Sequence, residues 1–254
     1  MKINKKGQVT IFIILAVLIV VFGILIYTFY PSIKDGLETE TKTPEQFVSN
    51  CLKEDLENLV EKISSQGGSL NPEHYFLYNG NKLEYLCYTD EYYLTGKRLN
   101  PMLFQHIEKE IKNNIQARAN ECFDNLVESY EKKGYSAELK KGSVSVELLP
   151  EKILTRFDNY TLTLTKSSAE KHDKFQIVLN NNLYELVEIA NSILDWESTY
   201  GDAETSIYMT LKKDLKVEKW KQLDGTTVYI LTDRNTQDKF QFASRSVAWP
   251  PAGL

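Results

Sequence analysis

An uncharged stretch near the N-terminus limits what this chain can fold into more than any other feature. Residues 9–30 carry no charged side chain, and only Thr10, Gly23 and Thr28 interrupt the apolar sequence. As a helix, such a stretch extends about 33 Å, enough to cross the hydrocarbon core of a bilayer. A helix buried in a globular core would show a polar face, and this one has none. We therefore predict an uncleaved transmembrane helix over residues 9–30.

The alternative interpretation is a removable secretory signal. Such a signal has an apolar region of about 7–15 residues and ends at a small-residue cleavage site. The run here is longer, and residues 31–35 (PSIKD) contain no such site. The flanking charges predict the orientation, because basic flanks stay in the cytoplasm. Residues 1–8 contain three lysines and residues 34–40 are net acidic, so we expect a cytoplasmic N-terminus and an extracellular C-terminal domain.

The charge balance excludes several classes of protein. The 254 residues carry a net charge of −5, although the first eight contain three lysines and no acid. An acidic body without a basic stripe is unsuited to nucleic acid, and we expect no such partner. Three cysteines are too few for a disulfide-rich scaffold or for a four-thiolate metal site.

The rest of the chain predicts an α+β domain after a linker. Residues 31–42 have no periodicity and are predicted to be the linker. Region 43–134 combines two amphipathic helices with a hairpin at Asn79-Gly80, and region 135–254 predicts an α+β region that ends in β hairpins. Strands are expected over 135–139, 143–149, 152–157, 160–165, 174–179, 215–222, 226–232 and 238–245, with a helix after Asn181 or Asn182. Short links favour antiparallel pairing, so we predict a single transmembrane helix followed by an extracytoplasmic domain of helices packed on mostly antiparallel sheet.

The cysteines predict one disulfide. Cys51 and Cys122 each lie on the apolar stripe of a different predicted helix. If the helices pack antiparallel, these residues can face each other, and outside the cytoplasm such a pair can oxidise. The bridge would contribute about 3–4 kcal/mol on the chain-entropy model. The alternative is a pair of buried free thiols. Cys87 is expected to be a buried thiol, with Cys51–Cys87 and Cys87–Cys122 as alternative pairings.

Two surface features have a functional and a structural interpretation each. Asn159-Tyr160-Thr161 matches an N-glycosylation acceptor between two predicted strands, although a chain of this length contains such a triplet about once by chance. Six of the fifteen tyrosines lie between residues 75 and 93. An exposed tyrosine-rich face can bind sugars or a partner protein. The alternative is a strand face packed on a helix.

No motif of a known catalytic class is present. The sequence has no Gly-x-Ser-x-Gly, His-Glu-x-x-His, Walker or Gly-x-Gly-x-x-Gly pattern. His74, His106 and His172 are far apart with polar neighbours, so we expect solvated histidines rather than bases or ligands. A Cys–His pair assembled only by the fold is the alternative. We therefore predict no catalytic residue, no cofactor and no metal site.

The junction before the apolar stretch resembles an archaeal type IV pilin leader of class III. The resemblance is carried by Lys5-Lys6-Gly7-Gln8-Val9-Thr10. In that family a peptidase cuts after a glycine just before the apolar helix, so the resemblance implies cleavage between Gly7 and Gln8. Pilins commonly carry a glutamate at the fifth mature position, where this chain has Phe12.

The combined pattern resembles an uncharacterised family of membrane-anchored surface proteins from small-genome (DPANN-type) archaea. It is carried by residues 5–14, 47–52, 66–68 and 121–125, by the tyrosine-rich hairpin and, more loosely, by residues 233–245. The resemblance implies a surface or envelope location and no particular chemistry.

Our leading hypothesis is a single-pass, membrane-anchored extracytoplasmic surface protein with a structural or interaction role. Its expected partners are the membrane and other envelope proteins or a second copy. The first alternative is a pilin-like filament subunit processed after Gly7. The second is a membrane-anchored extracellular hydrolase.

Overall fold

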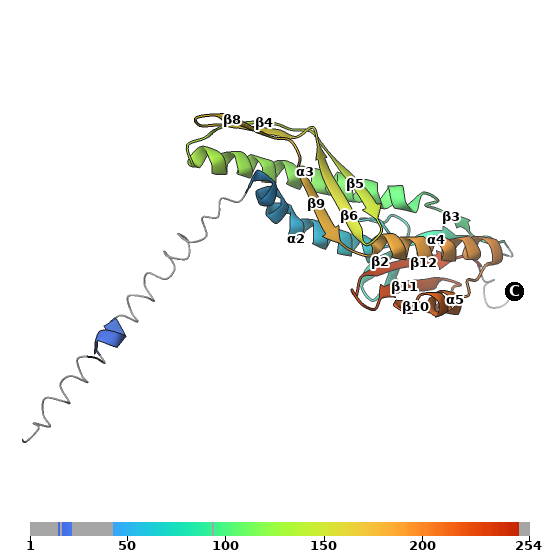
Figure 1. The fold of residues 1–254 in the computed structure, drawn as a ribbon. Coiled ribbons are helices and arrows are strands. Elements are labelled where there is room, and N and C mark those ends of the chain that lie inside the picture. Colours follow the sequence, from blue (N-terminus) through green and yellow to red (C-terminus); the bar gives the residue numbers. More distant parts are fainter. Residues whose placement is uncertain (1–14, 16, 22–42, 93, 249–254) are drawn as a thin grey trace, which may run out of the picture. The chain divides into compact units, whose positions relative to one another are not determined.

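The computed structural model describes residues 15, 17–21, 43–92 and 94–248 (Figure 1). The chain divides into two compact units, Met1–Thr43 and Pro44–Leu254. In the first unit, residues 15 and 17–21 are helical.

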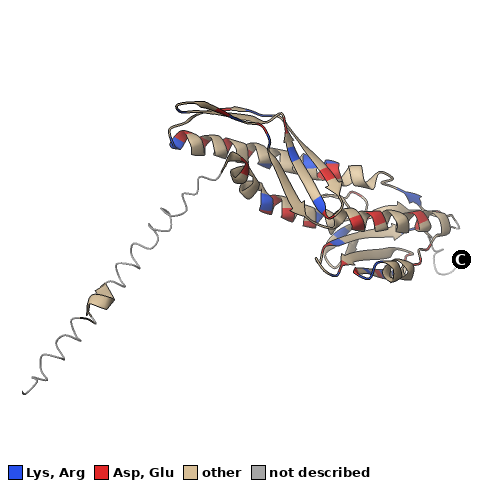
Figure 2. Cartoon of the chain, viewed as in Figure 1, with Lys and Arg blue, Asp and Glu red and all other residues tan. Residues whose placement is uncertain are grey.

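The predicted transmembrane helix is the part of the fold prediction that is wrong. Among the described residues, no helix is both long enough and apolar enough to cross a membrane. The three long helices of Pro44–Leu254 each bury one face, and they carry several charged side chains along their length (Figure 2). Most of residues 9–30, together with 1–8 and 31–42, lie outside the described residues.

The unit Pro44–Leu254 has an α+β architecture with mainly antiparallel sheets. Its helices are α2 (Pro44–Ser64), α3 (Leu103–Lys132), α4 (Leu183–Tyr200) and α5 (Ser206–Leu211). Its strands are β1 (Tyr75–Tyr78), β2 (Asn81–Tyr88), β3 (Lys97–Arg98), β4 (Ser136–Lys140), β5 (Ser143–Leu149), β6 (Lys152–Asp158), β7 (Thr161–Thr165), β8 (Ala169–His172), β9 (Gln176–Asn180), β10 (Leu215–Lys221), β11 (Thr227–Asp233) and β12 (Lys239–Arg245).

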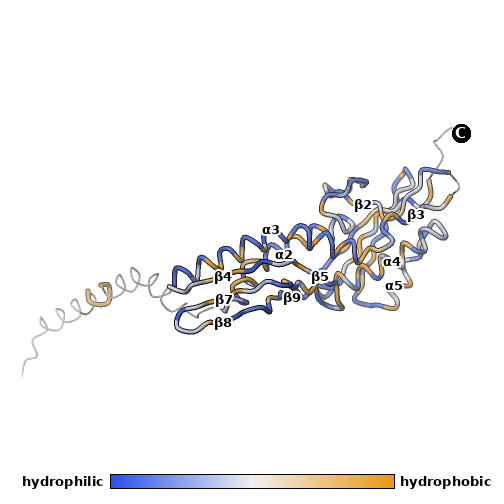
Figure 3. Tube along the Cα trace, turned by 90° about the horizontal axis from the view of Figure 1, so that it is seen from above, coloured by the Kyte–Doolittle hydropathy of each residue, from blue (hydrophilic) through white to orange (hydrophobic). Residues whose placement is uncertain are grey.

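Helices α2 and α3 pack antiparallel along their apolar stripes. Cys51 contacts Cys122 and Asp55 contacts Arg118, so residue numbers rise along α2 as they fall along α3. Apolar positions recur along both helices between hydrophilic ones (Figure 3). The buried residues follow a spacing of three and four: Val48, Leu52, Leu56, Val60 and Ile63 in α2, and Leu103, Ile107, Ile111, Ile115, Ala119, Cys122 and Leu126 in α3. Each fully buried Leu or Ile stabilises the fold by about 1.5–3 kcal/mol.

A bent three-stranded meander covers α3. Strands β4, β7 and β8 form one antiparallel sheet, and their continuations β5, β6 and β9 form another. Gly142 lies at the bend between β4 and β5, where a Cβ atom would stand 1.9 Å from the carbonyl oxygen of Asp158. Opposite it, Asn159 has a φ of 62°, a conformation that Asn tolerates better than most residues. The bend therefore depends on these two residue types.

Side chains of α3 protect the open edge of this meander. Gln116 Oε1 accepts the Val144 N–H at 2.9 Å, and Glu108 Oε1 accepts the Leu148 N–H at 2.9 Å. Both amides belong to the edge strand β5, whose unpaired groups would otherwise be free to bind another strand. Two helix side chains thus replace a missing neighbour strand.

The third sheet has six strands in the order β1-β2-β12-β11-β10, with β3 paired to β2. Its pairings are antiparallel except for β12 with β2, which is parallel. Helix α4 packs on this sheet (Figure 1), and Tyr229, Phe240 and Phe242 are fully buried beneath it. The last turn of α4 lies beside β11 and β12, so that the buried acid Glu197 contacts side chains of both strands.

Candidate functional site

The disulfide between Cys51 of α2 and Cys122 of α3 is present, which confirms the prediction. Their Cα atoms are 6.0 Å apart, and the sequence separation is 71 residues. The two positions meet because both lie on the facing stripes of antiparallel helices. The bridge therefore joins two elements that already share an apolar core.

Cys87 is the third cysteine and is free and buried. Burial raises the pKa of its thiol to about 11, and the nearby Glu197 carboxylate acts in the same direction. Neither alternative pairing with Cys51 or Cys122 occurs. A thiol that stays protonated is a poor nucleophile, so Cys87 acts as a packing residue.

The other two predicted sites are a glycosylation acceptor and a leader cleavage site. Asn159 is exposed in the turn between β6 and β7, beside an open groove of about 360 Å³ at the bend of the meander. Gly7 and Gln8 lie outside the described residues. Glycosylation at Asn159 and cleavage after Gly7 therefore stay predictions.

The histidines have more contacts than the sequence suggests. The His74 ring contacts the rings of Tyr85 and Tyr88, with centroid distances of 4.8 and 4.3 Å. His172 Nδ1 is 2.8 Å from a carboxylate oxygen of Glu45. The tyrosine-rich hairpin thus packs partly on itself, while the Leu77 side chain of its edge strand remains exposed.

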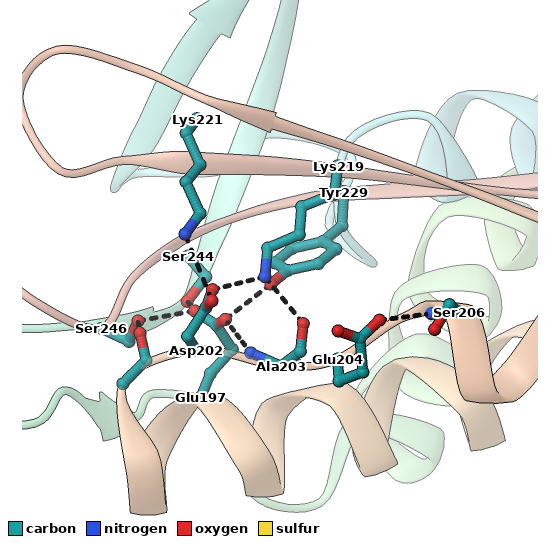
Figure 4. Close-up of polar contacts among 11 residues, drawn as sticks. Glu197, Asp202, Ala203, Glu204, Ser206, Lys219, Lys221, Tyr229, Ser244 and Ser246 are labelled. Carbon is teal, nitrogen blue, oxygen red and sulfur yellow. Dashed lines mark hydrogen bonds and ion pairs between the residues drawn. The ribbon is translucent and has the colours of Figure 1, made fainter.

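Several hydrogen bonds converge on a buried acid near the end of α4 (Figure 4). Glu197 is fully buried, and its Oε1 accepts hydrogen bonds from the Tyr229 hydroxyl at 2.5 Å and the Ala203 N–H at 3.0 Å. Its Oε2 accepts from the Ser244 hydroxyl at 2.7 Å and the Ser246 hydroxyl at 2.6 Å. We call these five residues the Glu197 cluster. Because all four donors are uncharged, hydrogen bonds alone replace the water that burial removed.

A lysine stands just outside the Glu197 cluster. Lys219 Nζ pairs with Asp202, donates to the Ala203 carbonyl at 2.7 Å, and lies 5.7 Å from the centre of the Tyr229 ring (Figure 4). Burial, followed by the Glu197 carboxylate, raises the pKa of Tyr229 far above its ordinary value. Tyr229 therefore keeps its proton and remains a donor. The cluster joins α4, β11, β12 and the loop after α4.

A second polar cluster connects the loop after α2 to β2 and α3. The Ser69 hydroxyl donates to Glu84 Oε2 at 2.6 Å and lies 2.7 Å from His106 Nε2. Asn100 Nδ2 donates to Glu84 Oε1 at 2.9 Å. Burial is the largest cause that raises the pKa of Glu84. We call these four residues the Ser69 cluster.

The Ser69 cluster has serine, histidine and acid together, but not in the order of a catalytic triad. In a triad the acid orients the histidine through its second ring nitrogen. Here the carboxylate of Glu84 contacts the serine hydroxyl itself, and Ser69 is a buried residue. Since that hydroxyl donates to Glu84, the His106 ring nitrogen beside it acts as a donor. The arrangement therefore holds three elements together rather than aligning a nucleophile with a base.

An open groove lies between α2 and the sheet residues around Lys239. It has a volume of about 570 Å³. We call it the amide groove, because five of its residues are Asn or Gln. It is lined by Glu57, Val60, Glu61, Ser64, Ser65, Asn81, Leu179, Asn180, Asn181, Gln237, Asp238, Lys239 and Gln241.

The described residues hold no group of three or more His, Cys, Asp or Glu side chains that could bind a metal ion. Comparison of the chain with models of protein families, with curated proteins and with solved structures finds no match.

Proposed function

We propose that this chain is an extracytoplasmic protein of the cell envelope with a structural or interaction role. The observation that carries the proposal is the Cys51–Cys122 disulfide. Disulfides persist in oxidising compartments and are rare where glutathione and thioredoxin keep thiols reduced. A bridge between two core helices, rather than near a reactive surface thiol, is typical of a stabilising role.

Binding, rather than catalysis, is the activity that the described surface favours. The rings of Trp196 and Tyr200 on α4 lie in contact, with their centres 4.9 Å apart. Tyr200 is largely exposed, and Trp196 and Trp220 of β10 are each about half exposed. Trp and Tyr are enriched at protein interfaces. The serine of the Ser69 cluster, by contrast, is buried against two partners. We therefore propose another envelope protein, or a second copy of this chain, as the partner.

The compartment is tested by thiol mapping. Native cells are lysed in N-ethylmaleimide, and the protein is digested without reduction. We expect one linked peptide pair that joins the segments around Cys51 and Cys122, and a Cys87 that is alkylated after denaturation. Alkylation of all three cysteines in denatured, unreduced protein would contradict the proposal.

Protease added to intact cells provides an independent test. We expect the segment 44–248 to be degraded while a cytoplasmic marker protein remains intact. If that segment is protected until the cells are lysed, the extracytoplasmic location is wrong.

A further inference from the structure

One wall of the amide groove is acidic and lacks close counter-ions. Glu57 and Glu61 are one helical turn apart on α2, where like charges repel. Glu57 has a loose ion pair with Lys53, with a nitrogen–oxygen distance of 3.9 Å. Within the described part of the chain, no ion pair involves Glu61. This wall therefore presents negative charge to whatever enters the groove.

The lining of the groove includes a serine hydroxyl group with no hydrogen-bond partner among the described residues. Ser64 is only 5 % exposed, and its neighbours on the floor are the buried side chains of Val60 and Leu179. Its hydroxyl group forms no hydrogen bond with another described residue. Because the residue is otherwise buried and its hydroxyl group is open to the groove, a ligand that supplies a donor or an acceptor can hydrogen-bond it there.

The opposite wall offers free amides. The side chains of Asn81, Asn180 and Gln241 make no hydrogen bonds to other described residues. Each amide presents both a donor and an acceptor, which matches the alternating N–H and C=O groups of a peptide backbone. Asn181 and Asp238 are different, because Asn181 Nδ2 donates to Asp238 Oδ1 at 2.8 Å and so stiffens the wall.

We propose that the amide groove binds an extended polypeptide segment of the partner through an arginine side chain. The guanidinium would lie against Glu57 and Glu61, and the amides would hydrogen-bond the backbone. The lining contains three acids and the single base Lys239, so its charge is complementary to arginine. Arginine is preferred to lysine because its planar fork can contact two carboxylate oxygens at once. The volume lies within the range of about 300–1,000 Å³ that ligand pockets have.

This inference rests on the proposed function, since it names the chemistry of the partner. Its test uses the full chain and a fluorescein-labelled Ser-Gly-Arg-Gly-Ser peptide, with binding followed by fluorescence anisotropy. The matched peptide carries citrulline, which has the shape of arginine without its charge. We expect the citrulline peptide to bind at least about tenfold more weakly than the arginine peptide, because it leaves the groove carboxylates unpaired.

Variants locate the binding. Glu57→Gln with Glu61→Gln should weaken binding of the arginine peptide to the level of the citrulline peptide. The control pair is Glu54→Gln with Glu131→Gln, which makes the same charge change at two exposed acids outside the groove and should bind as the native chain does. Equal loss in both pairs, or loss in neither, would overturn the proposal, as would absence of binding by the native chain.

A charge-reversal variant tests the proposal by a gain of binding rather than by a loss of binding. Glu57→Lys with Glu61→Lys should gain binding of a Ser-Gly-Glu-Gly-Ser peptide that the native chain does not bind. Failure to gain it, in a variant whose thermal midpoint is native-like, would contradict the proposal. None of these outcomes changes the thiol map or the protease result, so failure here is distinguishable from failure of the proposed function.

Discussion

Two regions of the unit Pro44–Leu254 join distant segments in opposite ways. Helices α2 and α3 share an aliphatic core and are linked covalently at Cys51 and Cys122. Helix α4 and its sheet are linked at Glu197, where four uncharged donors converge on one buried carboxylate. One link is a bond between two residues, and the other is a network that depends on every member.

The two links stabilise the fold in different ways. A disulfide stabilises chiefly by restricting the unfolded chain, so its contribution depends little on its surroundings. A buried carboxylate stabilises only if its hydrogen bonds are complete, because each unpaired partner carries the cost of lost hydration. The α2–α3 region should therefore respond to reductant, and the α4 region to substitution of single polar groups.

The largest expected effect comes from Glu197→Ala. Removal of the carboxylate leaves the hydroxyl groups of Tyr229 and Ser244 buried without their acceptor, and it also opens a cavity. Ser246 can still donate to the Gly201 carbonyl oxygen at 2.8 Å. We expect the free energy of unfolding to fall by about 3–5 kcal/mol. Denaturant unfolding of the full chain measures it. Glu188→Ala is the control, because Glu188 is an exposed acid on the same helix and should cost far less. Similar losses in both variants would show that the network has no special role.

Loss of the disulfide should rank second. Cys51→Ser with Cys122→Ser should lower the free energy of unfolding by about 3–4 kcal/mol, because the unfolded chain regains the entropy of an open loop. Reductant should shift the thermal midpoint of the native chain toward that of the variant and leave the variant unchanged. A reductant effect of the same size in the variant would mean that the bridge is not its target.

The Ser69 cluster predicts a smaller, pH-dependent effect. Burial raises the pKa of Glu84 above its ordinary value of 4.5, so the folded state binds this proton more tightly than the unfolded state does. Stability from this group is therefore present at low pH and is lost as the pH rises from the ordinary to the raised pKa. The slope is at most about 1.4 kcal/mol per pH unit. Glu84→Gln should flatten this part of the stability profile, measured by denaturant unfolding at a series of pH values. A profile parallel to that of the native chain would contradict the assignment.

The smallest effect is expected at the surface of the disulfide-linked pair. Arg118 pairs with Asp55 across α2 and α3 at 2.7 Å, but both side chains are well exposed. Solvent and salt screen such pairs, which commonly contribute little. Asp55→Asn should therefore leave the thermal midpoint nearly unchanged. A large shift would show that surface charge, rather than the core and the bridge, holds the two helices together.

The covalent link could be predicted from the sequence, whereas the buried network could not. Cys51 and Cys122 stand out because each falls on an apolar stripe, and that periodicity is readable without the fold. Glu197 follows Ile193 and Leu194 at a spacing of four and three, which places it on the buried face of α4. From that spacing, the burial of Glu197 could have been predicted. Its meaning depends on Ser244 and Ser246, whose positions are set only by the pairing of distant strands.

Other features of the molecule depend on tertiary contacts that no local sequence pattern shows. Asn100 lies shortly before α3, which begins at Leu103 without a side-chain cap. The Asn100 side chain instead donates to Glu84, a partner 16 residues away. The amide groove was equally hidden, because its walls come from α2, β2, β9 and β12. The apolar stretch 9–30 led to a spanning helix that the described residues do not contain.

The covalent loop between Cys51 and Cys122 also determines what a cut in the chain would do. Residues 52–121 include exposed positions such as Tyr92 and Leu94, and exposed loops are preferred sites of proteolytic nicking. A single cut within this loop would leave two fragments that are still bridged and packed through the α2–α3 core. Such a nicked protein would run as one species on a denaturing gel until a reductant separates it. If the protein lies outside the cell, as we propose, one protease cut in this loop would not separate it into two molecules, as it would separate an unbridged chain.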